Sequence, residues 1–161
     1  MQKTLELAIQ LEIEGQKYYL EQANKNKDNE LFKVFNLLAD AEKEHEKLLR
    51  KRLNDEDYVL DNSNIDKIKE VFNGLKNFDV KNTFKTTQLD VYRLAVDIEE
   101  KSIKLYQDML KEADNDKDKE LLKFLINEEN QHLILFEEFV KMVSRPEEWV
   151  ESAEFGLRED Y

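Results

Sequence analysis

The chain contains only two histidines, and each of them follows a glutamate by three residues. The two pairs are Glu42–His45 and Glu129–His132. Residues three apart on a helix lie on the same side, so each pair would present a carboxylate and an imidazole together. Such oxygen and nitrogen ligands suit iron or manganese. The chain has no cysteine, which excludes a disulfide, a cysteine-ligated zinc site, an iron–sulfur cluster and a cysteine nucleophile.

The two Glu-x-x-His pairs belong to an internal repeat. The segment from Ala8 to Tyr19 resembles the segment from Ala95 to Tyr106, with the same offset of 87 residues that separates the two pairs. The repeat therefore adds Glu12 and its counterpart Glu99 to the candidate ligands. A single Glu-x-x-His is a weak signal, because a core histidine can simply be satisfied by its local glutamate. The duplicated pattern with one shared offset is a strong signal of metal ligation.

Segments with an apolar residue every three or four positions predict the elements that hold these residues. They indicate four long helices, over about 3–24, 30–53, 87–113 and 119–143. Short polar connections between the first two and between the last two predict two antiparallel hairpins. A long crossover, 54–86, is expected to carry a short helix over about 64–77. The predicted fold class is an all-α, antiparallel four-helix bundle over residues 1–144, followed by a tail over 145–161.

Each candidate ligand lies in the middle of the inward apolar stripe of its helix. In the last helix, Leu125 and Phe136 lie on either side of Glu129 and His132. Glu128 is also within reach of His132, but the offset and the stripe both select Glu129. Burying four unpaired carboxylates would be very unfavourable, and no Lys or Arg occupies these central positions. Two divalent cations would neutralise them.

The remaining composition limits the kind of partner. The net charge is -12, with 39% charged residues, which argues against nucleic acid and against anionic membrane surfaces. The first residues lack the apolar run of a signal peptide, and no segment is long and apolar enough to span a membrane. We therefore expect a cytoplasmic protein.

The tail after Ser144 differs in character from the bundle. Pro146 is expected to block simple continuation of the last helix. Ser144 and Glu147 are spaced as a capping box, which predicts a new short helix. Trp149 and Tyr161 are among the apolar anchors of this tail.

The motifs resemble those of ferritin-like di-iron carboxylate proteins, and most closely those of rubrerythrins. The resemblance covers about residues 3–143 and rests on Glu12-x-x-Gly15-x-x-Tyr18-Tyr19, on the first Glu-x-x-His pair and on their counterparts in the second half. It implies a ferritin-like fold and two bound iron ions, with manganese or zinc as substitutes. The ligands that it implies are Glu12, Glu42, His45, Glu99, Glu129 and His132.

The resemblance also implies a role for each ligand. Glu42 and Glu129 would bridge the two metals, and Glu12 and Glu99 would be terminal ligands. Each histidine would hold one metal. Rubrerythrins carry a further carboxylate three residues before the second terminal ligand, where this chain has Val96.

Rubrerythrins reduce peroxide, so the resemblance implies an oxidoreductase that reacts with O₂ or peroxide. Full-length rubrerythrins have a rubredoxin-like domain whose four cysteines bind iron. This sequence has no cysteine, so electrons would come from a separate donor such as a rubredoxin-like protein. Two alternatives are an iron-handling protein of the ferroxidase type and a non-catalytic helical scaffold stabilised by a metal such as zinc.

Four further residues lie close to the candidate ligands along the stripes. Tyr19 and Tyr106 are either plain core aromatics or hydrogen-bond donors to the carboxylates. Gly15, and Ser102 in the matching position, leave room beside the metals for a small oxidant or allow close helix contact.

A homodimer is a further expectation. An outer apolar stripe formed by Leu94, Ile98 and Leu105 would be its interface.

Overall fold

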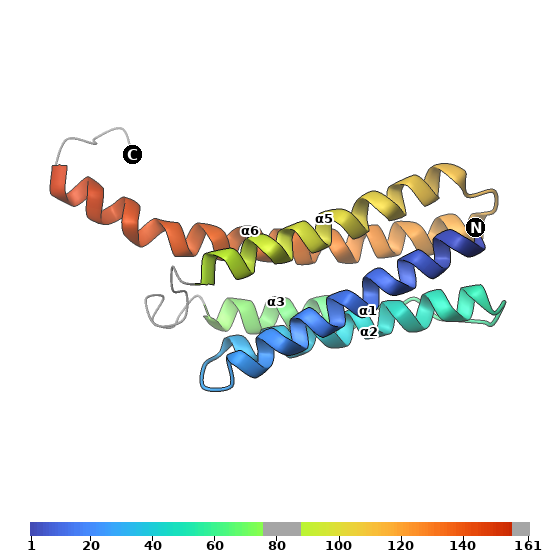
Figure 1. Cartoon of the computed structure of the whole chain (residues 1–161), viewed down its shortest axis with the longest axis horizontal. Helices are drawn as coiled ribbons and strands as arrows, with labels where there is room; N and C mark the ends of the chain where they lie inside the picture. Colours follow the sequence, from blue (N-terminus) through green and yellow to red (C-terminus); the bar gives the residue numbers. More distant parts are fainter. Residues whose placement is uncertain (76–87, 156–161) are drawn as a thin grey trace.

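Five helices make up the regular structure within residues 1–75 and 88–155, where the computed structural model describes the backbone (Figure 1). Side chains are described for residues 1–75 and 88–144. No strand occurs in these ranges. The prediction of an all-α bundle is confirmed. The helices are α1 (Gln2–Lys25), α2 (Leu31–Leu53), α3 (Ser63–Leu75), α5 (Leu89–Glu112) and α6 (Asp116–Phe155).

The helices form two antiparallel hairpins, α1 with α2 and α5 with α6, as the sequence predicts (Figure 1). Both turns are short and polar, and in each an asparagine side chain accepts a hydrogen bond from a backbone N–H in the first turn of the helix that follows. Asn29 Oδ1 accepts a hydrogen bond from the Leu31 N–H at 2.9 Å, and Asn115 Oδ1 accepts one from the Asp118 N–H at 2.8 Å. These bonds satisfy backbone donors that the first helical turn leaves free.

The hairpins face each other so that α1 lies against α5, while α3 lies along α2 and also contacts α6 (Figure 1). The predicted crossover helix is therefore present, at Ser63–Leu75, and it packs on the bundle through Ile65, Ile68 and Phe72. The part of the crossover from 76 to 87 lies outside the described residues. Arg52 of α2 forms an ion pair with Asp118 of α6 and ties the two hairpins together at one end.

The predicted break at Pro146 is wrong. α6 continues as one helix to Phe155 and extends past the end of the bundle (Figure 1). Proline removes a single backbone hydrogen bond, and the residues after it, up to Phe155, contain no glycine that would end the helix. The predicted capping box is wrong as well, since the Ser144 hydroxyl donates to the Val140 carbonyl at 3.1 Å, as an interior helical serine does. The side chains expected to anchor the tail lie outside the described ones.

The apolar core is divided into two clusters along the bundle. One cluster contains the stacked rings of Tyr19, Phe35 and Phe136, and the other contains Leu49 and Leu122. Buried polar residues occupy the length of bundle between them. The charged stripe positions are therefore enclosed by apolar side chains at both ends, as the sequence indicates.

None of the described helices is long and apolar enough to cross a bilayer. The cytoplasmic location stays a prediction.

Candidate metal centre

The structure brings all six predicted ligands together in the middle of the bundle. Each long helix contributes from its central turns: one glutamate from α1, one from α5, and a Glu-x-x-His pair from each of α2 and α6. Every one of these side chains is buried, with at most 2% of its surface exposed. The six residues are Glu12, Glu42, His45, Glu99, Glu129 and His132.

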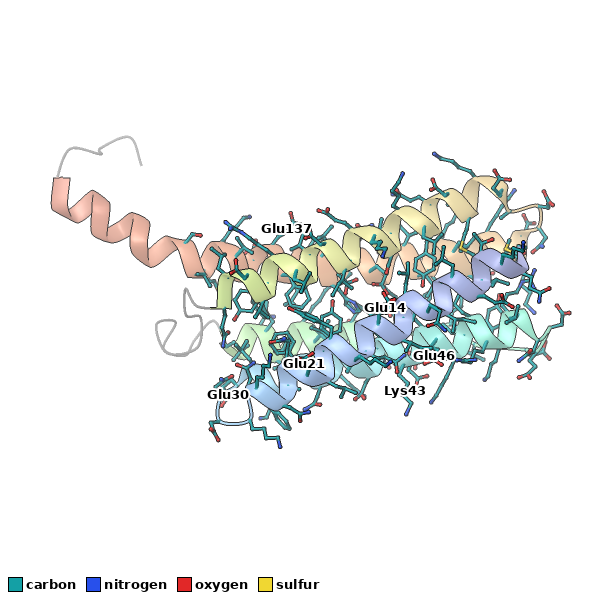
Figure 2. All side chains as sticks on the ribbon, viewed as in Figure 1. Glu14, Glu21, Glu30, Lys43, Glu46 and Glu137 are labelled. Carbon is teal, nitrogen blue, oxygen red and sulfur yellow. The ribbon has the colours of Figure 1, made fainter. Side chains whose placement is uncertain are left out.

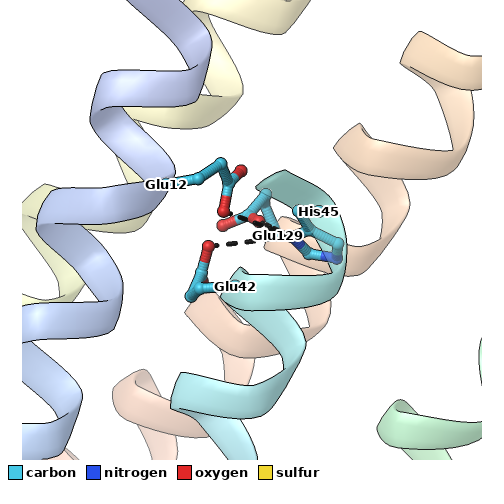
Figure 3. Close-up of side chains that lie close together, drawn as sticks. All are labelled: Glu12, Glu42, His45 and Glu129. Atoms are coloured by element: carbon cyan, nitrogen blue, oxygen red, sulfur yellow. Dashed lines mark ion pairs between the residues drawn. The ribbon is translucent and has the colours of Figure 1, made fainter. Parts of the chain in front are cut away.

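The first half of the site surrounds the imidazole of His45 (Figure 3). Its Nδ1 atom lies 2.6 Å from Glu129 Oε1, 3.5 Å from Glu12 Oε2 and 3.7 Å from Glu42 Oε2. One ligand atom from each of these four residues lies within 4.8 Å of the others. Three helices thus aim three carboxylates and one nitrogen at a common point.

The second half repeats this arrangement around His132. Its Nδ1 atom lies 3.3 Å from Glu42 Oε1, 3.4 Å from Glu99 Oε1 and 4.0 Å from Glu129 Oε2. Glu42 and Glu129 belong to both groups, each offering one oxygen to either side. The two imidazole rings face each other with centroids 6.0 Å apart.

Most of these inward atoms have no hydrogen bond of acceptable geometry, although they lie close together. The buried atoms without a partner include Nδ1 of both histidines and one oxygen each of Glu12, Glu99 and Glu129. Buried polar atoms are nearly always paired in native proteins, so several orphaned acceptors at one place need an explanation. Cations held between the oxygens and nitrogens would satisfy them, and the donor set fits iron or manganese.

The metal-free cluster holds protons because its carboxylates repel one another. Burial raises the pKa of Glu12, and the Glu42 carboxylate raises it further. Burial also raises the pKa of Glu129, together with the charges of Glu12 and Glu42. For Glu42, burial alone would raise the pKa, but the neighbouring Glu12 carboxyl and the two imidazoles hold it well below its usual value. Glu42 is thus held in its ionised form.

Both histidines are strongly basic in this setting. Burial alone would lower the pKa of His45, but the carboxylates of Glu12 and Glu129 outweigh it and raise this pKa well above its usual value. The same balance, with Glu99 as the main carboxylate, raises the pKa of His132 to about 10. Both imidazoles therefore hold a proton near neutral pH when no metal is bound.

Two tyrosines donate hydrogen bonds to the carboxylates of Glu12 and Glu99. Tyr19 of α1 donates its hydroxyl hydrogen to Glu99 of α5, and Tyr106 of α5 donates to Glu12 of α1. Burial raises the pKa of both phenols well above the usual value, as do these carboxylates, so the hydroxyls remain donors. Of the two interpretations of the tyrosines, the structure favours hydrogen bonding.

Gly15 lies directly against the carboxylate of Glu42. A methyl group in place of its hydrogen would lie 3.5 Å from Glu42 Cγ and 3.7 Å from Glu42 Oε2, which is ordinary contact distance. The glycine therefore leaves open the space next to a carboxylate that belongs to both halves of the site. Its counterpart Ser102 is also buried.

Glu128 is a functional candidate that sequence reasoning set aside. It belongs to neither group of inward ligands, so the preference for Glu129 agrees with the geometry. It is nevertheless buried, and its Oε1 lies 3.4 Å from Nε2 of His45, on the side of the ring away from the cluster. The sequence did not indicate the contact between Glu128 and His45. Glu128 lies four residues before His132 on its own helix, whereas the histidine that it contacts lies on α2.

Other acidic residues near the ligands in sequence do not belong to the two ligand groups. Glu14 is exposed (Figure 2), and so are Glu44 and Glu100. Glu46 is half-buried and accepts hydrogen bonds from Gln16 and Arg50. Its bond to Gln16 joins α2 to α1 (Figure 2).

Val96 is half-buried and packs against the apolar cluster that contains Tyr19. Asp97, the nearest carboxylate in sequence, is exposed. No further carboxylate from this turn of α5 reaches the two ligand groups among the described residues.

The two ligand groups combine four glutamates and two histidines, all buried in the middle of a helical bundle. This arrangement defines a ferritin-like protein with a carboxylate–histidine centre that could hold metal ions. Comparison with protein families agrees, because the model of the rubrerythrin family matches residues 3–140. The chain belongs to the rubrerythrin family. No curated protein and no solved structure matches the chain.

Proposed function

We propose that the chain binds two iron ions and acts as an oxidoreductase that reduces O₂ or peroxide. The observation that supports this most is the pair of buried ligand groups sharing Glu42 and Glu129, with orphaned oxygens and nitrogens aimed inward. Membership of the rubrerythrin family points the same way. Manganese or zinc could take the place of iron, since the donors are the same.

In this proposal Glu42 and Glu129 would each serve as a ligand to both ions, because each faces both halves of the site. Glu12 and Glu99 are terminal ligands, and the tyrosines fix their orientation. His45 and His132 each bind one ion through Nδ1, the atom that faces the carboxylates. Bound iron would supply the two electrons that reduction of an O–O bond needs.

The protein's own groups would control water and protons at the centre. The apolar clusters at both ends of the site exclude solvent. Gly15 leaves space for Glu42 to change orientation. The Tyr19 and Tyr106 hydroxyls would hold their carboxylates in place while the centre reacts.

Reduction of one peroxide molecule to water consumes two electrons and two protons. We propose that a separate electron donor, such as a rubredoxin-like protein, supplies the electrons, because the sequence has no cysteine to hold a rubredoxin-type iron. The homodimer through Leu94, Ile98 and Leu105 is part of the same proposal. Leu94 is 49% exposed, and the other two are half-buried.

The decisive experiment reconstitutes the metal-free protein with two equivalents of ferrous ion without oxygen. Addition of O₂ or peroxide should then change the visible spectrum within mixing time or shortly after. Excess reductant should give many turnovers of peroxide, as an enzyme does. A single oxidation followed by retention of iron would favour the iron-handling alternative, and a protein that binds zinc but does not react with iron and peroxide would favour the scaffold.

A further inference from the structure

The two histidines occupy equivalent places in the repeat, yet their outer nitrogens have different surroundings. His45 Nε2 lies 3.4 Å from Glu128 Oε1, and both side chains are about 2% exposed. Glu128 belongs to α6 and reaches His45 across the interface between the two hairpins. The outer edge of His45 is therefore held by a buried carboxylate.

The same contact does not exist on the other side. With the offset of 87 residues, the counterpart of Glu128 is Ala41, a fully buried methyl group. His132 Nε2 has no hydrogen-bond partner among the described residues. His132 instead borders a cavity of about 80 Å³ between α3 and α6, which is lined mainly by apolar side chains including Ile68, Phe72 and Leu135.

The rest of the centre is close to symmetric, so this difference stands out. Each half has one terminal glutamate, and each of these accepts a hydrogen bond from a tyrosine on the opposite helix. Both halves share Glu42 and Glu129. Among the groups that touch the candidate ligands, Glu128 is the charged one without a counterpart in the repeat.

A carboxylate behind a metal-binding imidazole has a known physical effect. It accepts the N–H of the nitrogen that faces away from the metal, which fixes the tautomer, orients the ring and makes the ligating nitrogen more basic. Here the inward nitrogen is Nδ1 and the outward one is Nε2. Glu128 would thus make Nδ1 of His45 a stronger metal ligand. Ala41, at the equivalent position of the repeat, has no side-chain acceptor for the Nε2 N–H of His132.

We infer that Glu128 is a positioning residue that makes the two metal sites unequal, with the site at His45 binding its ion more tightly than the site at His132. This inference rests on the proposed dinuclear centre. It predicts that the protein loads the His45 site first and that the ion at His132, next to the cavity, exchanges more readily.

The test is an anaerobic titration of the metal-free, full-length protein with Co²⁺ in the presence of a competing chromophoric chelator. The wild-type protein should bind two ions in two resolved steps. Glu128→Gln keeps the size of the side chain but removes its charge, and it should weaken the tighter step by about 10–100-fold and leave the weaker step unchanged. Glu137→Gln is the matched control, because Glu137 is exposed on the same helix (Figure 2).

Two further variants assign the steps. His45→Ala should remove the tighter step, and His132→Ala should remove the weaker one. In the zinc-loaded protein, Glu128→Gln should also speed hydrogen exchange of the His45 ring N–H, as seen by NMR, and leave that of His132 unchanged. A purely structural role of Glu128 would not separate the two rings in this way.

Several outcomes would overturn the inference. They are two equal binding steps in the wild-type protein, an equal loss in both steps with Glu128→Gln, or removal of the weaker step by His45→Ala. In these cases the dinuclear centre itself would stand. Failure of the wild-type protein to bind two Co²⁺, Fe²⁺ or Zn²⁺ ions would overturn the centre and the inference with it.

Discussion

Tyr106 on α5 donates a hydrogen bond to Glu12 on α1, and Tyr19 on α1 donates one to Glu99 on α5. The two bonds cross between the same pair of helices in opposite directions. Each tyrosine therefore supports the carboxylate of the other hairpin, not that of its own helix. The hairpins are held in register at the centre by groups that also orient two candidate ligands.

The first prediction removes one of these bonds. Tyr19→Phe leaves the buried Glu99 carboxylate without its donor, so the metal-free protein should lose about 1–3 kcal/mol of unfolding free energy in urea denaturation. Tyr58→Phe is the matched control, because the buried Tyr58 hydroxyl has no hydrogen-bond partner among the described residues. Its removal should change the stability by less than about 0.5 kcal/mol.

A double-mutant cycle makes this prediction stricter. If the bond carries the effect, Tyr19→Phe and Glu99→Gln should couple by about 1 kcal/mol, and Tyr19→Phe should couple to Glu12→Gln much less. Equal coupling to both glutamates would show that the phenol acts through packing alone.

The second prediction concerns the glutamates shared by the two halves. Glu42→Ala should reduce the metal content from two ions toward none, because Glu42 faces both groups. Glu12→Ala should leave close to one ion, because Glu12 belongs to the His45 group alone. Metal analysis after gel filtration measures both, with the exposed Glu14→Gln as the control on the same helix as Glu12. Equal losses from Glu42→Ala and Glu12→Ala would contradict the shared role.

The third prediction follows from the protons of the metal-free cluster. The pKa of His132 is raised to about 10 and that of His45 lies well above its usual value, so both rings are protonated at pH 7. Their Nδ1 atoms must lose a proton before they bind metal, and so must the carboxyl groups of Glu12 and Glu129, whose pKa values are also raised. Metal uptake should therefore release at least one proton per histidine, and the apparent affinity should rise with pH up to about 10. A pH indicator in weakly buffered solution measures the release.

The raised pKa values of the two histidines also determine whether the metal-free protein gains or loses stability as the pH rises. A histidine whose folded pKa lies above its unfolded value stabilises the fold fully below about pH 6.5, and this contribution fades as the pH rises toward the folded pKa. The metal-free protein should therefore lose stability between pH 6.5 and 10, and added metal should remove that loss. Stability that rises over this range without metal would contradict the protonated cluster.

The repeat made the cluster of six inward side chains predictable, because the shared offset and the helical period together fix which side chains face inward. The period of one helix does not give the register of its neighbour, so the partners of Tyr19 and Tyr106 were not predictable. Glu128 was missed for the same reason, since its contact with His45 depends on how α6 sits against α2. Pro146 misled because a proline lowers helix stability locally without forcing the chain to leave the helix.

The fourth prediction compares two glycine substitutions. It separates their effect on helix stability from the effect of the space beside Glu42 on the reaction with peroxide. Gly15→Ala should stabilise the metal-free protein by up to about 1 kcal/mol through helix propensity, because the new methyl group meets Glu42 only at ordinary contact distance. The methyl group fills the space beside the Glu42 carboxylate, so the iron-loaded variant should react more slowly with peroxide at unchanged metal content. Gly74→Ala in α3, where no described residue outside the glycine's own helical turn has an atom within 4 Å of the new methyl group, should give a similar gain in stability with no change in rate. Stopped-flow absorbance measures the rates, and equal rates in all three proteins would show that the space beside Glu42 has no part in the reaction.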